Sequence, residues 1–421
     1  MDALYISNLR CFADVGWIKL APLTLLVGEN STGKTSFLAA MRIAWDLAHS
    51  PTELNFNEEP FQLGAFDQLA HVYGGAKGRS KTIELGHRIL GKEGFEIQTI
   101  LVQDGSQALV ASSTLNMTGA SATLSRTAKH VKLAFQGRQG HQEQLFPKEA
   151  RELELALPGN RITWDMVPYL LMHDRKDPRP TELFERLYRL TRRLRVSTNR
   201  PYAFAPVRTK PLRTYDPIRI APHPEGEHVP MQLARMRFTD EGAWQRMREG
   251  LEAFGKAAGL FDHLDVRTLG KSESDPFQLR VKVAGPLVNL IDVGYGVSQV
   301  LPLLVETLST ENRLLLMQQP EVHLHPRAQA ELGSLLGALV RDTPKRFVVE
   351  THSDYTIDRI RSDIRDGKGP KPEDVVILYF ERRKGSVHVH RLTIDSDGNL
   401  VGAPKGYREF FMTEQRRSLG L

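Results

Sequence analysis

The sequence predicts an α/β fold: a core with a mixed, largely parallel sheet and flanking helices, an antiparallel β subdomain and an inserted helical arm. Three observations lead to this prediction. An apolar strand runs through a glycine-rich loop into an amphipathic helix near the N-terminus. Segments that alternate apolar and polar residues follow between residues 81 and 157. Strands and helices then alternate over the last third of the chain, which is typical of a parallel sheet.

The chain begins with a strand, a loop and a helix. The segment PLTLLVG (22–28) is an apolar run that ends in glycine, so we expect a buried strand there. After ENSTG, apolar residues return with the spacing of one helical face, at Phe37, Met41, Ala44, Trp45 and Ala48.

An antiparallel β meander is expected next. Four segments alternate with a period of two and are separated by Gly, Ser and Asn residues. They are KTIELGHRIL (81–90), GFEIQTILV (94–102), HVKLAF (130–135) and RELELAL (151–157). We assign residues 1–160 to the N-terminal part of the core and its antiparallel subdomain.

Residues 161–260 are expected to form the helical arm, with a helix at PTELFERLYRLTRRLR (180–195). Its apolar face carries Leu183, Phe184, Leu187, Leu190 and Leu194. Its other face carries Arg186, Arg189, Arg192, Arg193 and Arg195. A solvated helix face is the simpler interpretation. The alternative is an arm that contacts a partner, or the phosphates of DNA or RNA, through these arginines.

A proline-rich stretch, PYAFAPVRTKPLRTYDPIRIAPHPEGE (201–227), predicts a connecting loop, and AWQRMREGLEAFGKAAG (243–259) predicts a helix. Residues 261–421 form the C-terminal part of the core. Its expected strands are HLDVRTL (263–269), FQLRVKVA (277–284), RLLLM (313–317), RFVVE (346–350), DVVILYF (374–380) and SVHVHRL (386–392). Its expected helices are GVSQVLPLLVETL (296–308) and RAQAELGSLLGALVRD (327–342).

Composition narrows the class of protein. The net charge of +6 and the pI of about 9.3 permit contact with nucleic acid without demanding it. The single cysteine, Cys11, excludes an internal disulfide and fits a reducing compartment. The N-terminal residues do not resemble a signal peptide, and no apolar run approaches the roughly 20 residues of a membrane span. We therefore expect a cytoplasmic protein with no membrane segment.

The segment GENSTGKTS has the spacing Gly28-x-x-x-x-Gly33-Lys34-Thr35, which is a Walker A motif. Glycines let the backbone curl so that successive N–H groups face phosphate oxygens. Lys34 would neutralise the phosphates and Thr35 would bind Mg²⁺. The sequence therefore predicts a site for ATP and Mg²⁺. Its candidate residues are Gly28, Asn30, Ser31, Thr32, Gly33, Lys34, Thr35 and Ser36.

Three further segments follow in a fixed order. DVGYGVSQVLP places Gly294, Gly296 and Ser298 at the start of a helix, where free N–H groups can bind an anion. Taken alone, a simple glycine turn that caps the helix is the favoured interpretation of this segment. LLLMQQPEVHLHP ends an apolar strand in two adjacent glutamines. FVVETHSD places His352 directly after another apolar strand.

Together these motifs resemble those of the ABC-type ATPases of the RecF, chromosome-maintenance and overcoming-lysogenization-defect group, and most closely its small stand-alone AAA ATPases of bacterial antiphage loci. YAFAPVRTKPLRTYDP (202–217) is also similar to a Pro-x-Arg stretch of that subgroup. The resemblance covers residues 1–50 and 285–360 and is loose between them.

The resemblance implies a homodimer or higher homo-oligomer in which two protomers enclose ATP. Lys34 and Thr35 would hold phosphates and Mg²⁺ on one side, while the signature residues Gly294, Gly296 and Ser298 would close on the γ-phosphate from the other. His352 would contact that phosphate. The glutamine of the Q-loop would be Gln62 or Gln68, and the spacing does not choose between them.

Gln318 and Gln319 depart from the group, in which the first position is an acid that supports Mg²⁺ and the second a glutamate that polarises the attacking water. An amide cannot accept a proton, and general-base assistance is typically worth about 10²–10⁴-fold. Mg²⁺ can still be held near Gln318 through Thr35, phosphates and water. We therefore expect slow ATP hydrolysis. Glu321, or Glu350 at the next strand end, could replace Gln319 as the base.

The leading functional hypothesis is a nucleotide-gated switch in antiphage defence, in which a separate partner carries a nuclease or toxin activity, as in the PARIS, Septu and retron systems. The sequence ends at Leu421, where larger members of the group continue into a nuclease domain, so we expect any cutting to come from a partner. Three alternatives stay open: a DNA-repair or DNA-clamping ATPase, the ATPase of a transporter, and a scaffold that binds nucleotide without turnover.

Overall fold

A computed structural model of the protein describes residues 1–49, 54–74, 78–91, 94–127, 130–137, 140–147, 200–218, 221–272, 274–309, 314–404 and 406–407, and the single positions 164, 167, 185, 188, 189, 191, 194, 413, 416 and 417. The chain divides into two compact units. Unit 1 comprises Met1–Leu20, Glu29–Pro201 and Phe380–Val389, and unit 2 comprises Ala21–Gly28, Tyr202–Tyr379 and His390–Leu421. The expected division at residues 160 and 260 stays a prediction.

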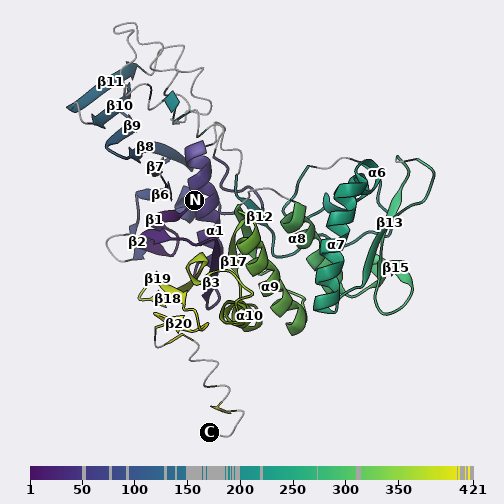
Figure 1. The fold of residues 1–421 in the computed structure, drawn as a ribbon. Helices are drawn as coiled ribbons and strands as arrows, with labels where there is room; N and C mark the ends of the chain where they lie inside the picture. Colours follow the sequence, from purple (N-terminus) through teal and green to yellow (C-terminus); the bar gives the residue numbers. More distant parts are fainter. Residues whose placement is uncertain are drawn as a thin grey trace. The chain divides into compact units, whose positions relative to one another are not determined.

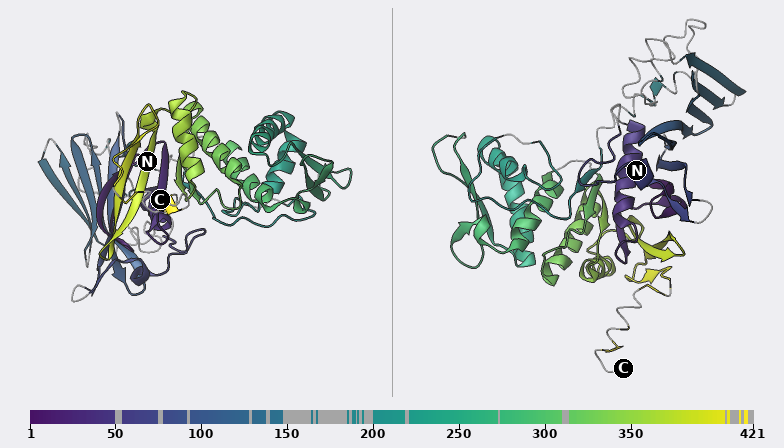
Figure 2. Two further views of the ribbon diagram at one scale, coloured as in Figure 1. Left: turned by 90° about the horizontal axis from the view of Figure 1, so that it is seen from below. Right: turned by 180° about the vertical axis from the view of Figure 1, so that it is seen from behind.

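Unit 1 contains an eight-stranded antiparallel sheet in the order β11-β10-β9-β8-β7-β6-β1-β2 (Figures 1 and 2). Its strands are β1 Ala3–Leu9, β2 Phe12–Lys19, β6 Thr82–Ile89, β7 Phe95–Asp104, β8 Gln107–Met117, β9 Ala120–Arg126, β10 His130–Gly137 and β11 Gly140–Pro147. The predicted meander is confirmed in β6, β7 and β10, whereas RELELAL lies outside the described residues. Sequence reasoning did not identify β8, β9 and β11.

Helix α1, Lys34–His49, covers one face of this sheet and contacts β6, β1 and β7. Phe37, Met41 and Ala44 are fully buried, as their spacing predicts. In β7 alternate side chains are buried, which is the pattern of a strand with one face on the core.

Two buried histidines join α1 to β6. His49 Nδ1 lies 3.0 Å from Leu194 O, His87 Nδ1 lies 3.2 Å from Ala44 O, and the two Nε2 atoms are 3.3 Å apart. Two neutral imidazoles carry two N–H groups between them. They can therefore form hydrogen bonds in two of these three contacts, and the third contact has no hydrogen to donate. Burial lowers the pKa of His49 to about 4 and lowers that of His87 well below its usual value.

The second sheet has the order β12-β16-β17-β3-β18-β19-β20. Its strands are β12 Tyr202–Phe204, β16 Leu314–Gln318, β17 Arg346–Glu350, β3 Leu23–Gly28, β18 Val375–Arg383, β19 Ser386–Ile394 and β20 Leu400–Val401. The first four belong to unit 2 and are parallel, so their carboxyl ends meet at one edge. The predicted parallel core is confirmed there. The boundary between the units falls within β18 and β19.

Five helices of unit 2 are described: α6 Val229–Thr239, α7 Glu241–Ala258, α8 Tyr295–Ser309, α9 Pro326–Asp342 and α10 Asp354–Arg365. The predicted helices are confirmed as α7, α8 and α9. Helix α7 starts at Asp240, whose side chain accepts from Ala243 N at 2.9 Å, and ends at Gly259 in the left-handed conformation (φ 68°). The helices pack with the parallel strands into one apolar core within unit 2.

Two predictions about the middle of the chain were wrong. The segments at 263–269 and 277–284 do not join the parallel sheet; with β15 (Leu287–Asn289) they form a separate antiparallel sheet, as β13 (His263–Thr268) and β14 (Phe277–Lys282), and β13 contacts α6 and α7. The stretch 201–227 is not all loop. Tyr202–Phe204 forms β12, because its buried residues pair with β16.

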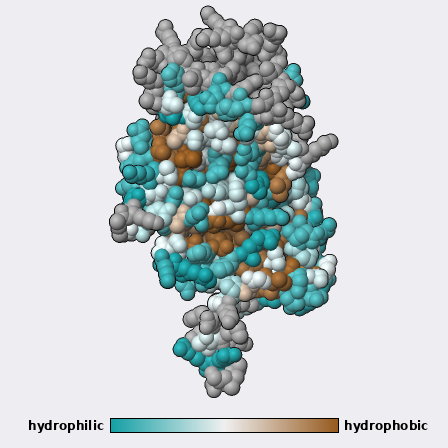
Figure 3. All heavy atoms as spheres, turned by 90° about the vertical axis from the view of Figure 1, so that its left-hand side faces the viewer, coloured by the Kyte–Doolittle hydropathy of each residue, from teal (hydrophilic) through white to brown (hydrophobic). Residues whose placement is uncertain are grey.

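The remaining described elements are short: α2 Phe66–Leu69, β4 Val72–Gly74, β5 Gly78–Arg79, η4 Leu290–Asp292 and η5 Pro372–Asp374. Within the part of the chain that the structure describes, no helix is long and apolar enough to cross a membrane. The face drawn in Figure 3 is mainly hydrophilic, with separate apolar areas.

We predict that unit 1 is destabilised by acid through the histidine pair. The pKa of His49 is lower in the folded protein than its value of about 6.5 in the unfolded chain. The contribution of neutral His49 to the free energy of unfolding is therefore present above pH 6.5 and is lost as pH falls toward about 4. A shift of this size corresponds to about 3 kcal/mol of unfolding free energy. Denaturant unfolding between pH 4 and 7 measures it.

The exposed His388 provides the control: His388→Gln should keep the same pH dependence, while His49→Gln should weaken it and leave the part that His87 contributes. An unfolding free energy that does not change between pH 6.5 and pH 4 would contradict this account.

Candidate functional site

The loop between β3 and α1 has the curled backbone that its glycines predict. Gly28, Ser31 and Gly33 have φ values of 142°, 59° and 92°. Lys34 is 3% exposed, and its Nζ donates to Glu29 O at 2.7 Å, across the loop. A loop with alternating backbone conformations and a helix N-terminus turns N–H groups toward one concavity, which suits an anion.

Gly33 is required by packing as well as by its conformation. A Cβ there would lie 2.3 Å from Cys11 Sγ and 3.0 Å from Phe12 Cζ, both in the β1–β2 hairpin of unit 1. Cys11 Sγ also lies 3.9 Å from Thr32 O. Burial raises the pKa of Cys11 to about 11, so the thiol is protonated at neutral pH. Cys11 therefore supports the loop as a small apolar group.

The other loop residues divide into two sets. Asn30, Ser31 and Thr35 have exposed side chains. Thr32 is buried and its hydroxyl donates to Glu29 O at 2.8 Å, while Ser36 is buried and its hydroxyl accepts from Arg10 Nη1 at 3.4 Å. The first set is placed to meet a ligand, and the second set holds the loop in shape.

The two Q-loop candidates are both exposed in unit 1. Gln68 lies in α2, where its Oε1 accepts from Ala65 N at 3.2 Å. Gln62 lies between the buried residues Phe61 and Leu63. The side-chain oxygen of Gln68 is thus already bonded within its own helical turn. This bond favours Gln62 as the glutamine of the Q-loop.

Gln318 is the last residue of β16 at the carboxyl edge of unit 2, and Gln319 directly follows it. Gln318 is buried, and its Nε2 donates to Phe204 O in β12 at 3.3 Å. An ionised carboxylate at this position has no proton to donate to that carbonyl. Gln319 adopts a left-handed backbone (φ 42°), and its N–H donates to Glu350 O at 2.9 Å. Such outliers are found at functional sites, where the surrounding structure holds them.

Glu321, Glu350 and His352 lie near these amides in unit 2. Glu350 is buried and pairs in register with Gln318. Glu321 is 7% exposed, and its Oε1 accepts from His352 N at 2.7 Å. Burial raises the pKa of Glu321. The His352 side chain is exposed at the surface of the unit. Glu321 therefore connects the segment after β16 to the segment after β17.

The three signature residues differ in their surroundings. Among the described residues, a Cβ on Gly294 would meet nothing within 4 Å, whereas a Cβ on Gly296 would lie 2.9 Å from His323 O. Ser298 is buried and its hydroxyl donates to Tyr295 O at 3.0 Å. Gly296 is thus explained by close packing of α8, and the exposed Gly294 leaves open space at the start of that helix.

The donor groups in the loop fit a nucleoside triphosphate. A buried ammonium, a helix N-terminus and an exposed hydroxyl are the groups that bind phosphates and their Mg²⁺. The fit to Mg²⁺ at β16 is weaker. The amide nitrogen of Gln318 is directed at a carbonyl, so only its oxygen is a possible ligand.

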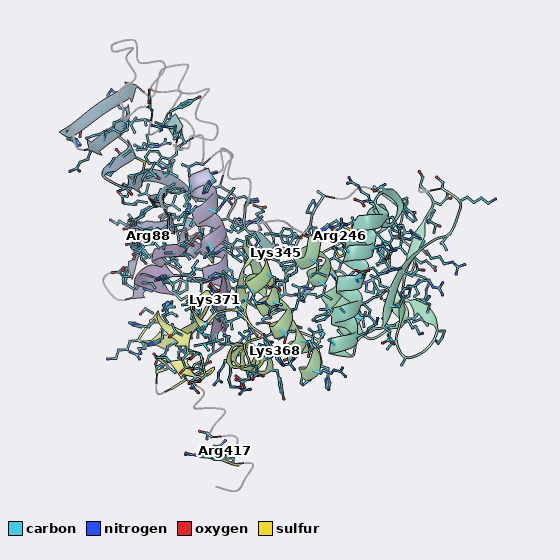
Figure 4. All side chains as sticks on the ribbon, viewed as in Figure 1. Arg88, Arg246, Lys345, Lys368, Lys371 and Arg417 are labelled. Atoms are coloured by element: carbon cyan, nitrogen blue, oxygen red, sulfur yellow. The ribbon has the colours of Figure 1, made fainter. Side chains whose placement is uncertain are left out.

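Basic side chains often have structural partners in this protein. Among the residues labelled in Figure 4, Arg88 pairs with Glu96 across β6 and β7, and Lys345 Nζ donates to Thr307 O at 2.5 Å. Of the arginines proposed for nucleic acid, Arg189 is exposed and its Nε donates to Glu185 O at 3.3 Å. Arg186, Arg192 and Arg193 lie outside the described residues.

One buried charged residue was missed. Arg208, in the stretch predicted to be a loop, is 2% exposed, and its N–H donates to Gln299 Oε1 in α8 at 3.1 Å. The only sequence signal was the Pro-x-Arg stretch, which gave no indication of where the side chain lies.

The chain is similar to several solved structures of chromosome-maintenance head domains. The "SmcHead bound to the C-winged helix domain of ScpA" is 10% identical, with a TM-score of 0.45, over 94% of this chain and 98% of that chain. A Pyrococcus furiosus head with an extended coiled coil, bound to the C-terminal domain of ScpA, is 10% identical with a TM-score of 0.44 and 99% of each chain covered. The Thermotoga maritima head domain is 11% identical, with a TM-score of 0.36, over 92% and 97%.

A search of curated proteins gave no match to this sequence. A family model described as "AAA domain, putative AbiEii toxin, Type IV TA system" matches residues 23–358. The matched span contains most of the chain, from β3 through the phosphate-binding loop, α8 and β16 to His352. The chain therefore belongs to this family of AAA-domain P-loop ATPases.

Proposed function

We propose that the protein is an ATP-dependent switch that binds ATP with Mg²⁺, dimerises around it and hydrolyses it slowly. The observation that carries this proposal is the combination of a complete phosphate-binding loop with two amides at the end of β16. The loop supports tight binding, while Gln318 and Gln319 lack the negative charge that hydrolysis uses.

Binding is assigned to the loop after β3. Lys34 would neutralise the phosphate charge, the N-terminus of α1 would direct its N–H groups at the phosphates, and Thr35 would hold Mg²⁺. Mg²⁺ supplies charge neutralisation and keeps several of its own waters, so it needs few protein ligands.

Slow turnover follows from the chemistry of Gln319. A carboxylate at this position would take a proton from the attacking water, whereas an amide can orient water but cannot accept the proton. Glu350 lies opposite Gln318 in the register of β16 and β17, and Glu321 follows Gln319 by two residues. The bond from His352 N to Glu321 Oε1 supports a holding role for Glu321, and leaves Glu350 as the better candidate for proton acceptor.

Dimerisation is assigned to the start of α8. The open space at Gly294 and the free N–H groups of the helix would let a partner protomer's phosphate approach. Since the hydroxyl of Ser298 is bonded to Tyr295 O, this residue would act through the backbone of the first turn. The exposed His352 would contact the same phosphate, as the resemblance implies.

The biological setting is also a proposal. The family description names a toxin of a type IV toxin–antitoxin system, which supports a role in bacterial defence. In this role ATP would hold the dimer in one state, and a separate nuclease or toxin protein would carry the effector activity. Co-purification of the tagged protein with the product of a neighbouring nuclease or toxin gene, in ATP but not without it, tests this part.

The first prediction concerns binding. Calorimetry should detect uptake of ATP with Mg²⁺ by the wild type, and size-exclusion chromatography should show a dimer in ATP. Lys34→Ala should abolish both, because the ammonium is the main positive charge of the loop. Lys19→Ala, at an exposed position of the same unit, is the matched control and should bind normally. No heat from any purine triphosphate with the wild type would refute the proposal.

The second prediction concerns turnover. The wild type should hydrolyse ATP at well below about one per second, and Gln319→Glu should raise the rate by about 10–10³-fold, because it restores a proton acceptor. Gln278→Glu on β14 adds the same charge elsewhere and should have no effect. A wild-type rate of tens per second, or an unchanged rate in Gln319→Glu, would count against the amides as the cause of slow turnover.

A further inference from the structure

A basic segment of unit 1 contacts the phosphate-binding loop. The end of β18 and the start of β19 belong to unit 1, and this β18–β19 hairpin carries Arg382, Arg383 and Lys384, all of them exposed. Arg382 Nη2 donates a hydrogen bond to Ser31 O in the loop. The two residues are 351 positions apart in the chain, so local sequence pattern does not indicate this contact.

The packing of Phe380 explains why Arg382 reaches the loop. Phe380 is 1% exposed. Its ring lies edge-on to Phe37 in the first turn of α1, with ring centroids 5.5 Å apart, and to Phe12 in β2, at 6.2 Å. Side chains two positions apart in a strand point to the same face of the sheet. Arg382 therefore extends from β18 on the side of the first turn of α1, which directly follows the loop.

The hairpin is also bonded to the residue that supports the loop at Gly33. Val387 N in β19 donates to Cys11 O at 3.0 Å, and Cys11 Sγ is the atom that a Cβ on Gly33 would meet. The β18–β19 hairpin is therefore fixed beside the loop through its backbone as well as through Phe380. The loop is supported by Cys11 at Gly33 and bonded to Arg382 at Ser31.

Ser31 is the loop residue at which such a bond matters most. Its φ of 59° lies in the left-handed region, which is unfavourable for a residue with a Cβ. Gly28 and Gly33 adopt positive φ values without this penalty. The left-handed backbone at Ser31 contributes to the curl that turns the N–H groups of the loop toward one concavity. An interaction that holds Ser31 in this conformation therefore prepares the loop for a phosphate.

We propose that Arg382 is a positioning residue for nucleotide binding, which holds the left-handed backbone of Ser31 through its carbonyl oxygen. A charged donor forms a stronger hydrogen bond than a neutral one. With this bond in place the loop is curled before ATP arrives, and a site that is already ordered binds its ligand more tightly. The inference rests on the proposed function, because the ligand of the loop is the nucleotide proposed above.

The test is Arg382→Met, measured by calorimetry with ATP and Mg²⁺. The Kd should rise about fivefold to thirtyfold, because the unfavourable conformation of one residue is then no longer held. The kcat at saturating ATP should stay within about twofold, because bound ATP itself orders the loop. The thermal midpoint without nucleotide should change by less than about 3 °C, because Arg382 is exposed.

Arg383→Met is the matched control. Arg383 is the next residue of β18, and its Nη2 lies 2.7 Å from Glu381 Oε2. The substitution removes the same charge from the same hairpin, and the Kd for ATP should change by less than about twofold. An equal rise of the Kd in Arg383→Met and Arg382→Met would assign the effect to the charge of the hairpin and would overturn the positioning role.

The Ser31→Gly variant separates the positioning role from a direct contact between Arg382 and phosphate. Glycine adopts a left-handed backbone without strain, so Arg382→Met should change the Kd of the Ser31→Gly protein by less than about twofold. If Arg382 bound the phosphates directly, its full effect would persist in this background. A rise of the Kd as large as in the wild-type background would therefore overturn the proposal.

Two further outcomes would contradict the positioning role while the proposed function stood. One is an unchanged Kd in Arg382→Met together with normal ATP binding by the wild type. The other is a thermal midpoint of Arg382→Met that falls by more than about 3 °C without nucleotide, which would assign Arg382 a general structural role. Absence of ATP binding by the wild type would instead refute the proposed function, so the two failures are distinguishable.

Discussion

The hydrogen-bonded register of four parallel strands is the constraint on which the rest of the site depends. Gln318 lies opposite Glu350, and Glu350 lies opposite Leu26, so β16, β17 and β3 end at the same edge of unit 2. Each loop that leaves this edge begins beside the others. The left-handed backbone of Gln319 and the bond from its N–H to Glu350 O are direct results of that register.

The positions of the acidic side chains at the carboxyl edge of the parallel strands follow from the same register. With amides at the end of β16, the described acids nearest to it are Glu350, in the neighbouring strand, and Glu321, in the following turn. The donor of Gln318 satisfies a carbonyl of β12, which a carboxylate could not do. The amides are therefore compatible with the local hydrogen bonding.

Much of the fold could be predicted from local pattern, since the strand–loop–helix at residues 22–49, strands β6, β7 and β10 of the meander and helices α7, α8 and α9 all have strong periodicity. The errors have physical causes. Tyr202–Phe204 is a three-residue strand in a proline-rich stretch, and its partner β16 is more than one hundred residues away. Alternation in β13 and β14 predicts strands correctly, but it does not indicate which sheet they join.

At the candidate site, too, the contacts of single residues could not be predicted from local pattern. Spacing predicts Gly33, and the resemblance predicts Gly294 and Gly296, as glycines of phosphate-binding segments, but their neighbours differ. Gly33 is fixed by Cys11 Sγ and Gly296 by His323 O, which are tertiary contacts that the sequence does not reveal. Gly294 has no such contact within 4 Å. Because a side chain there would meet no neighbour, packing gives no reason for glycine at this position, whereas close approach of a ligand to the helix N-terminus does.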